Sequence, residues 1–344
     1  MKFLTKKIPI YLLIVTMFIG IVTVLVVITS FKKDEEEKLQ SATINSQNIA
    51  TSCDMNISRL KGYKFIKPLL FAERSCEAEK LFSVKNAASN IINNLKTKGN
   101  IDNASVYIRL FNGRAEWISI NDEIKYQPGS LLKVPILITL LKMEEKTPGI
   151  LQTKLTLTQS AFATTGLKQE FLKSSIKVGS SYTIKELLNY MIINSDNNAT
   201  VLLNDHLPLV ELQKACTDLG ITTLDLTKSD SKISAKDYSA FWIALYNGSY
   251  LNFTNSEFAL SLLSKTDFNE GMVKGLPKNI KISHKFGEKG DPINHTLSET
   301  GIVYVNNFPY LITIMTQGKN QAALPNAIEE ISASVYNNIE SLTH

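Results

Sequence analysis

The chain has 344 residues, and 37 Lys and Arg against 32 Asp and Glu give it a formal net charge of +5. Part of this excess lies near the N-terminus, because residues 1–38 hold six lysines against one aspartate and three glutamates. The sequence has no basic stripe with interleaved aromatic residues, which argues against a nucleic-acid partner. It also has no internal repeats or low-complexity tracts, and three cysteines are too few for a disulfide framework.

The N-terminus predicts a membrane anchor. Residues 1–7 carry three lysines, and residues 8–29 form an uncharged, mostly apolar run of about the 20 residues that cross a bilayer as a helix. A cleaved signal peptide has a shorter apolar region that ends in a small-x-small site, and no such site follows Val27. We therefore expect one uncleaved transmembrane helix, a short cytoplasmic end at residues 1–7, and the rest of the chain outside the cell membrane.

Residues 30–79 are expected to form a juxtamembrane stalk and leading helices. Apolar residues recur at roughly helical spacing from 48 to 96, and Pro68 divides this run into two helices. Cys53 and Cys76 lie in this region and, in an oxidising compartment, either pair or remain free. Cys216 lies in a separate apolar-periodic run and is expected to be a buried free thiol.

Residues 80–344 are expected to form one catalytic domain with an ample core. Helical spacing, caps and β-type runs predict the following elements: helix 80–96; strands 104–111 and 115–120, joined at Asn112-Gly113; helices 130–145, 183–194, 198–204, 209–219 and 235–246; strands 280–287, 301–305 and 310–316; and helix 324–342. This order predicts an α+β fold, in which an antiparallel sheet is built from both chain ends, with flanking helices and an inserted all-helical subdomain.

Ser130 and Lys133 form the first candidate catalytic pair. They are three residues apart where the Pro128-Gly129 turn meets an apolar helical run, so both side chains lie on one helix face. A serine hydroxyl needs a nearby base to act as a nucleophile, and a lysine is such a base only when its pKa is lowered. A Ser-x-x-Lys pattern also occurs by chance in many helices.

Two later motifs have ordinary explanations when each is considered alone. The polar turn Ser195-Asp196-Asn197 has the residue types of a helix cap, and Lys285-Phe286-Gly287 resembles the end of many strands. In this order, however, Ser-x-x-Lys, Ser-Asp-Asn and Lys-x-Gly are the motif set of class A β-lactamases and penicillin-binding proteins. Over residues 80–344 the chain resembles this family of active-site serine enzymes, which implies a serine β-lactamase/transpeptidase-like fold.

The resemblance implies a role for each matching residue. Ser130 is the nucleophile that becomes acylated, and Lys133 is its activating base. Ser195 passes a proton to the leaving group, and Lys285 supplies positive charge for Ser195 and for a substrate carboxylate. The substrate-binding positions are Asn197 for the substrate amide, Gly287 on the same strand as Lys285, and Glu288, whose backbone N–H would form an oxyanion hole with that of Ser130.

Two departures from the family pattern bear on the activity. Class A β-lactamases hydrolyse their acyl-enzyme with a glutamate on a loop before the last motif, and residues 224–233 contain none. Asp230 is the nearest stand-in, or else a solvated loop residue, and without a positioned base deacylation is expected to be slow. Phe286 replaces the usual Thr or Ser that helps to bind a carboxylate, and it either alters that site or points into the core.

Three functions remain open after these observations. The first is a membrane-anchored, extracytoplasmic serine hydrolase or acyltransferase of the penicillin-binding-protein type, acting on a peptidoglycan-type peptide. The alternatives are a true β-lactamase and a catalytically vestigial binding module of the same fold. We expect no metal and no cofactor, because the four histidines, His206, His284, His295 and His344, lack ligand spacing.

Overall fold

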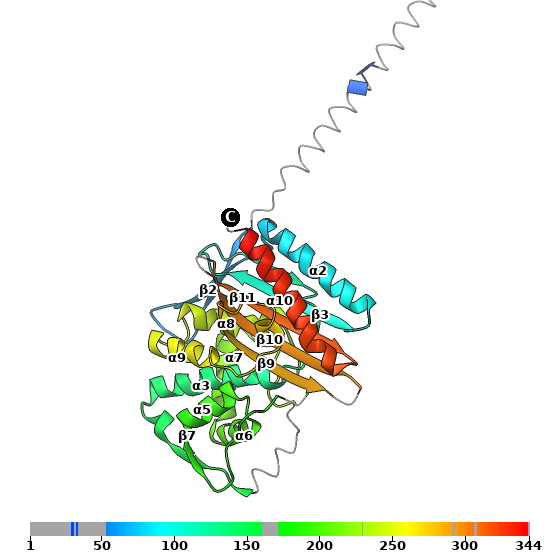
Figure 1. The fold of residues 1–344 in the computed structure, drawn as a ribbon. Helices are drawn as coiled ribbons and strands as arrows, with labels where there is room; N and C mark the ends of the chain where they lie inside the picture. The colour runs from blue at the N-terminus through cyan, green and yellow to red at the C-terminus, as the bar shows by residue number, and fades with distance from the viewer. Residues whose placement is uncertain are drawn as a thin grey trace, which may run out of the picture. The chain divides into compact units, whose positions relative to one another are not determined.

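A five-stranded antiparallel sheet organises the computed structural model (Figure 1), which describes residues 29–30, 32–33, 53–159, 171–228, 230–290, 293–305 and 308–342. The strands lie in the order β4-β3-β11-β10-β9, and each neighbouring pair is antiparallel. Their bounds are Asn103–Leu110 (β3), Trp117–Ile120 (β4), Lys281–Gly290 (β9), His295–Tyr304 (β10) and Tyr310–Gly318 (β11). Strands β3 and β4 precede the helices between residues 133 and 263, and β9, β10 and β11 follow them. The prediction of a sheet built from both chain ends is therefore confirmed.

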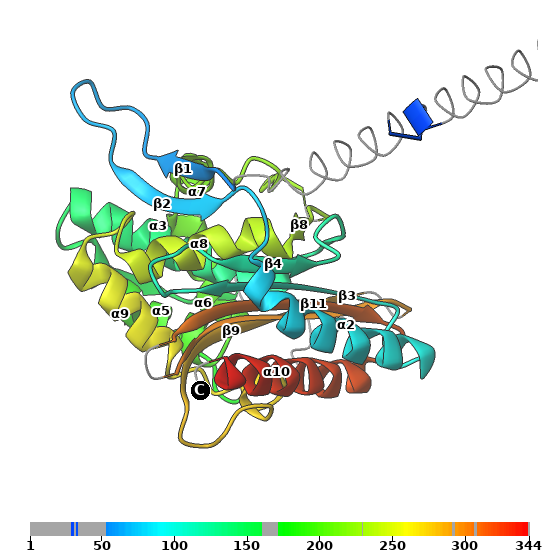
Figure 2. The same cartoon turned by 90° about the horizontal axis from the view of Figure 1, so that it is seen from above.

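Two long helices, α2 (Phe82–Thr97) and α10 (Leu324–Ser341), cover one face of this sheet (Figure 2). Each has an apolar stripe at helical spacing, such as Val84, Ala88 and Ile92 in α2, and both stripes join one buried cluster with the strands. Helices α2 and α10, which lie far apart in the sequence, therefore share one core with the sheet.

The other face of the sheet is covered by the helical block between β4 and β9. Helix α8 contacts the sheet, and its Ser239 hydroxyl lies 2.7 Å from the Thr313 hydroxyl of β11. The helices are α3 (Lys133–Lys146), α5 (Ile184–Ile193), α6 (Asn197–His206), α7 (Leu209–Asp218), α8 (Ala235–Asn247) and α9 (Phe253–Leu263). Helix α9 was not predicted from the sequence, although the Asn252 side chain caps its start by accepting a hydrogen bond from the Asn255 backbone N–H.

The helix prediction for residues 48–96 is wrong in its first half. Strands β1 (Met55–Arg59) and β2 (Leu69–Arg74) pair there as an antiparallel hairpin. Polar side chains of the sheet fix the second strand: Arg109 donates a 2.5 Å hydrogen bond to the Ala72 carbonyl, and Trp117 Nε1 donates a 2.8 Å bond to the Arg74 carbonyl. These long-range contacts override the helical spacing of the apolar residues.

The cysteines and the predicted anchor complete this part of the chain. Cys53 and Cys76 are both disulfide-bonded, and they are bonded to each other because Cys216 is the third cysteine and is a buried free thiol. Among the described residues, no helix is both long enough and apolar enough to cross a membrane. The predicted anchor at residues 8–29 lies outside the described residues except for Thr29.

Candidate active site

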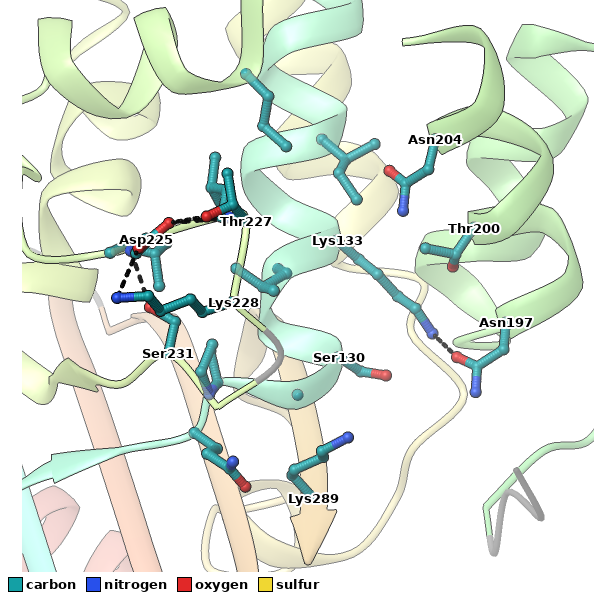
Figure 3. A pocket seen from close by; sticks show the side chains of 18 of the residues that line it. Ser130, Lys133, Asn197, Thr200, Asn204, Asp225, Thr227, Lys228, Ser231 and Lys289 are labelled. Atoms are coloured by element: carbon teal, nitrogen blue, oxygen red, sulfur yellow. Dashed lines mark hydrogen bonds and ion pairs between the residues drawn. The ribbon is translucent and has the colours of Figure 1, made fainter. Parts of the chain in front are cut away.

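Ser130 lies in a short 3-10 turn, Gly129–Leu132, that leads directly into α3. The hydroxyl of Tyr238 in α8 donates a 2.8 Å hydrogen bond to the Leu131 carbonyl and so ties this turn to the helical block. Just before this turn in the sequence, strand β5 (Lys125–Tyr126) pairs with β8 (Ile233–Ser234). The Ser130 side chain is half-buried and projects into the same cavity as Lys133 (Figure 3).

Lys133 is buried, with 2% of its surface exposed. Its Nζ donates hydrogen bonds to the Ser195 carbonyl at 2.5 Å and to Asn197 Oδ1 at 2.9 Å, and it lies 3.1 Å from Ser195 Oγ. Burial lowers the pKa of Lys133 to about 7, although the negative charges of Asp196 and Glu288 act in the opposite direction and raise it. The predicted activating lysine is therefore a candidate general base near neutral pH.

The turn that holds Ser195 is strained and firmly held. Ser195 has a φ of +57°, a left-handed conformation that non-glycine residues seldom adopt. The fully buried Asp196 carboxylate caps α6 through the Asn198 N–H at 2.9 Å and accepts further 2.9 Å bonds from the Ser175 hydroxyl and the Ile176 N–H. This network positions both oxygens of Ser195 against Lys133, and nothing in the sequence pattern indicated Ser175 or Ile176 as part of the site.

Lys285 approaches the same serine from β9. Its Nζ donates hydrogen bonds to Ser195 Oγ at 2.9 Å and to the Phe286 carbonyl at 3.0 Å, and the side chain is fully buried. Burial, reinforced by the positive charge of Lys133, holds the pKa of Lys285 well below its ordinary value. Because both amines contact one buried hydroxyl, protonation of either lysine disfavours protonation of the other.

The side chain of Phe286 points into the core rather than into the cleft. Its ring stacks on Phe268, with centroids 4.1 Å apart, and meets Phe171 edge-on at 5.6 Å. His284, two residues earlier on the same face of β9, is buried with its Nδ1 2.6 Å from a Glu299 carboxylate oxygen. Neither side chain blocks the cleft, so the sequence departure at Phe286 removes a hydroxyl without closing the site.

Two glycines allow the turn before Ser130 to lie directly against β9. A Cβ on Gly287 would lie 2.5 Å from the Pro128 carbonyl oxygen and 2.6 Å from the Leu131 nitrogen, and a Cβ on Gly129 would lie 2.3 Å from the Glu288 carbonyl oxygen. Such distances are too short for real Cβ contacts. The two glycines therefore let the backbone on either side of Ser130 pack directly against the backbone of β9 at Gly287 and Glu288.

If Ser130 is the nucleophile, Gly287→Ala should lower its acylation rate about 10²-fold or more, because the added methyl pushes the turn at Pro128–Leu131 away from the strand. Stopped-flow acylation by penicillin G measures this rate, and thermal unfolding checks that the variant is folded. Gly318→Ala is the matched control, since its nearest contacts are 3.3 Å. Equal acylation rates for a folded Gly287→Ala variant and the wild type would contradict this account of the turn.

The cavity beside Ser130 has a volume of about 700 Å³ and is drawn in Figure 3. Of the two aspartates between residues 224 and 233, Asp225 lines the cavity, whereas Asp230 is exposed and does not line it. Asp225 accepts hydrogen bonds from the Thr227 hydroxyl at 2.6 Å and N–H at 3.0 Å, and pairs with Lys228 at 3.3 Å. The Thr227 bonds lower the pKa of Asp225, so this carboxylate is a weak base.

A serine, two buried lysines and a second serine on this fold define an active-site serine hydrolase. The chain belongs to the Beta-lactamase enzyme family, whose model matches residues 86–339. The resemblance inferred from the three sequence motifs is therefore confirmed for the family.

Individual relatives agree with this assignment. Beta-lactamase VEB-1 of Pseudomonas aeruginosa is 24% identical over 245 residues, which cover 64% of this chain and 79% of that protein. The structure of PBP-A matches with a TM-score of 0.63 and 22% identity over 74% of this chain and 96% of PBP-A. A variant of the ancestral class A β-lactamase of Gram-negative bacteria matches with a TM-score of 0.65 and 16% identity over 75% of this chain and all of its own. At these identities the solved structures show the shared fold.

Proposed function

We propose that this serine hydrolase forms an acyl-enzyme on Ser130, with Lys133 as the base, and that it acts on amides of a cell-wall-type peptide. The observation that carries the proposal is the buried Lys133 amine, whose pKa is lowered to about 7. A neutral amine has two hydrogens and one lone pair. The two hydrogens go to the Ser195 carbonyl and Asn197 Oδ1, which leaves the lone pair for a hydroxyl proton.

Acylation then proceeds in two steps. Lys133 Nζ accepts the Ser130 proton while Ser130 Oγ bonds to the amide carbon, and the backbone N–H groups of Ser130 and Glu288 stabilise the resulting oxyanion. Lys133 next returns a proton through the Ser195 hydroxyl, 3.1 Å away, to the leaving nitrogen as the C–N bond breaks. The products are the Ser130 ester and the free amine, and Lys133 is again neutral.

Lys285 is assigned to the leaving-group side of this reaction. In the free site its pKa is well below the ordinary value because the side chain is buried. A substrate carboxylate placed beside it would favour the charged form and raise that pKa. In its charged form Lys285 would hold Ser195 Oγ and the carboxylate together. Asn197, which also contacts Lys133, is assigned to the substrate amide on the acyl side.

Slow deacylation distinguishes this proposal from a true β-lactamase. The carboxylate that lines the cavity, Asp225, is already hydrogen-bonded and has a lowered pKa, which makes it poorly suited to activate water. A vestigial binding module is also disfavoured. Burying two lysine side chains against one hydroxyl destabilises the folded protein, and a module that only binds a ligand would not need that arrangement.

The test is a burst experiment with nitrocefin and penicillin G. A variant of PBP-A has been solved as an acyl-enzyme complex with penicillin G, which makes that compound a suitable probe. We expect about one nitrocefin per protein to open rapidly, followed by slow turnover, and intact-mass spectrometry to show a lasting penicillin adduct. Rapid multiple turnover would instead favour the β-lactamase alternative, and no adduct in folded protein would favour the binding module.

We also propose that the chain is attached to the cell membrane, with the catalytic domain outside. The apolar run at residues 8–29 supports this, and so does the tip of the β1–β2 hairpin. The tip exposes Tyr63, Phe65 and Ile66, with Phe65 88% exposed, and between residues 55 and 72 the hairpin carries four basic side chains and no acidic one. Exposed aromatic and basic side chains together are typical of segments that lie at an anionic membrane surface.

We expect the chain without residues 1–29 to keep binding to vesicles of anionic lipid in a salt-sensitive manner. Each basic residue contributes about 1 kcal/mol at such a surface. Replacing Lys61, Lys64 and Lys67 together by Gln should therefore weaken binding roughly 100-fold in a co-sedimentation assay. The charge-matched control replaces three exposed lysines elsewhere: Lys96, Lys98 and Lys278. Equal loss in both triple variants would show that only net charge matters and would refute a role for the hairpin.

A further inference from the structure

The cavity beside Ser130 has a largely apolar far wall that the acylation chemistry does not use. Part of it is deeply buried, since Leu207, Leu212 and Leu224 are each no more than 8% exposed, whereas Leu209 is 45% exposed. We call the far wall the apolar wall and define it by six lining residues: Ile136, Val201, Leu207, Leu212, Leu224 and Leu226.

Part of this wall comes from the segment before β8. Strand β8 begins at Ile233 and pairs with β5, just before the Ser130 turn, which keeps the preceding segment near the cavity. Leu224 and Leu226 of that segment line the cavity. The resulting volume of about 700 Å³ is that of a ligand site rather than a packing defect.

The position of the apolar wall identifies which part of a substrate would reach it. The cavity is lined by Ser130, Lys133 and Asn197 but by neither Ser195 nor Lys285. Ser195 and Lys285 are the groups assigned above to the leaving amine and its carboxylate. The group that enters the cavity is therefore on the acyl side of the amide.

The charges near the cavity narrow the chemistry of that group. Asp225 and Lys228, which line the cavity next to Leu224 and Leu226 in the sequence, form an ion pair at 3.3 Å, so their charges offset each other. Thr200 and Asn204 line the cavity on the same helix as Val201, and the Thr200 hydroxyl already donates a 2.7 Å hydrogen bond to the Asp196 carbonyl. A charged acyl group against the six apolar residues would therefore lose hydration without gaining an opposite charge from them. An aliphatic group would instead gain from removal of its surface from water.

We propose that the apolar wall is a subsite for an aliphatic acyl chain, so that the preferred acyl donors are amides with an apolar chain of several carbons on the acyl side. This inference rests on the proposed acyl-enzyme function. The chain would remain in the cavity after acylation, next to the Ser130 ester. It would then exclude water from that ester, and an incoming amine would compete with water for the acyl group more effectively.

The test measures binding in the full chain carrying Ser130→Ala, so that no turnover is needed. Isothermal titration calorimetry compares N-hexanoylglycine with N-acetylglycine, two amides that have a carboxylate on the leaving side and differ by four methylenes. Full burial of one methylene corresponds to roughly a fourfold gain in affinity. We expect hexanoylglycine to bind about tenfold more tightly or better, since part of the chain stays exposed.

Two matched variants in the Ser130→Ala background locate the effect. Leu226→Asn places an amide in the half-buried loop part of the wall and should reduce the preference for hexanoyl at least threefold, with acetylglycine affinity unchanged. Leu155→Asn is the control, because Leu155 is also half-buried but lies in the short strand Lys154–Thr156 outside the cavity. One detergent is used throughout, so that ligand partitioning is equal for all variants.

The outcomes separate this inference from the proposed function. Equal affinity for the two acylglycines in folded protein overturns the aliphatic subsite, even if penicillin still acylates Ser130. A preference for hexanoyl that Leu155→Asn and Leu226→Asn reduce equally also overturns it, because the effect would then not arise at the apolar wall. A preference for hexanoyl that is lost in Leu226→Asn but kept in Leu155→Asn supports the subsite. If the wild type then forms no acyl-enzyme, that result counts against the proposed function and not against the subsite.

Discussion

Replacement of Ser130 by alanine is expected to abolish covalent labelling of the protein by penicillin G and by a fluorophosphonate. The Ser130 hydroxyl lies in the turn between β5 and α3 and faces the cavity that Lys133 also lines. Removing a catalytic nucleophile usually costs about 10⁴-fold or more in rate. Intact-mass spectrometry should therefore show an adduct of defined mass on the wild type and none on Ser130→Ala over the same time.

Ser83→Ala is the control for this experiment, because Ser83 is an exposed serine near the start of α2. The control should be labelled like the wild type. Ser195→Ala gives a finer comparison: it keeps the nucleophile and removes the hydroxyl that both lysines contact, so labelling should be slow rather than absent. Full labelling of Ser130→Ala would show that another side chain is acylated and would overturn the proposed mechanism.

The sequence predicted the parts of this site that depend on local spacing. Ser130 and Lys133 lie three residues apart on one helix entry, and the capping preference of Asp196 is realised at the start of α6. Contact of Lys285 with Ser195 joins residues 90 apart in the chain and was expected only through the family resemblance. Contact of Lys133 with Ser195, 62 residues apart, was not predicted. Local pattern specifies each segment, whereas the contact between segments depends on how the helical block packs.

The failures of prediction have similar physical causes. Residues 55–74 form a hairpin because side chains of β3 and β4 hold β2, and no spacing within the hairpin sequence shows those partners. The first half of β10, around Glu299, was missed because its polar residues do not alternate as in a half-buried strand. Glu299 is buried against His284 and the Met272 N–H, so partners distant in sequence satisfy it.

Acylation by penicillin G is expected to accelerate with rising pH, with an apparent pKa near 7. The base is the neutral amine of Lys133, and burial lowers its pKa to about 7. Below that value the neutral fraction falls about tenfold per pH unit, so the rate should fall in the same proportion, and above about pH 8 it should be constant. Stopped-flow measurement of the acylation rate from pH 5 to 9 gives this profile.

Lys133→Met should lower the plateau rate by about 10²- to 10⁴-fold, the usual contribution of a general base, and should remove the inflection near pH 7. Lys142→Met is the matched control, since Lys142 lies in the same helix but is paired with Glu145 at 2.9 Å and does not line the cavity. Its profile should coincide with that of the wild type, and thermal unfolding confirms that both variants are folded.

The shape of the pH profile also separates the two lysines. Lys285 contacts the same Ser195 hydroxyl, and burial also lowers its pKa, so substitution of each lysine is needed to assign the inflection. A bound substrate carboxylate would raise the pKa of Lys285. If Lys133 is the base, Lys285→Met should weaken substrate binding and raise KM, yet keep the inflection near 7. If the inflection instead disappears in Lys285→Met and persists in Lys133→Met, Lys285 is the base, and the roles proposed here for the two lysines must be exchanged.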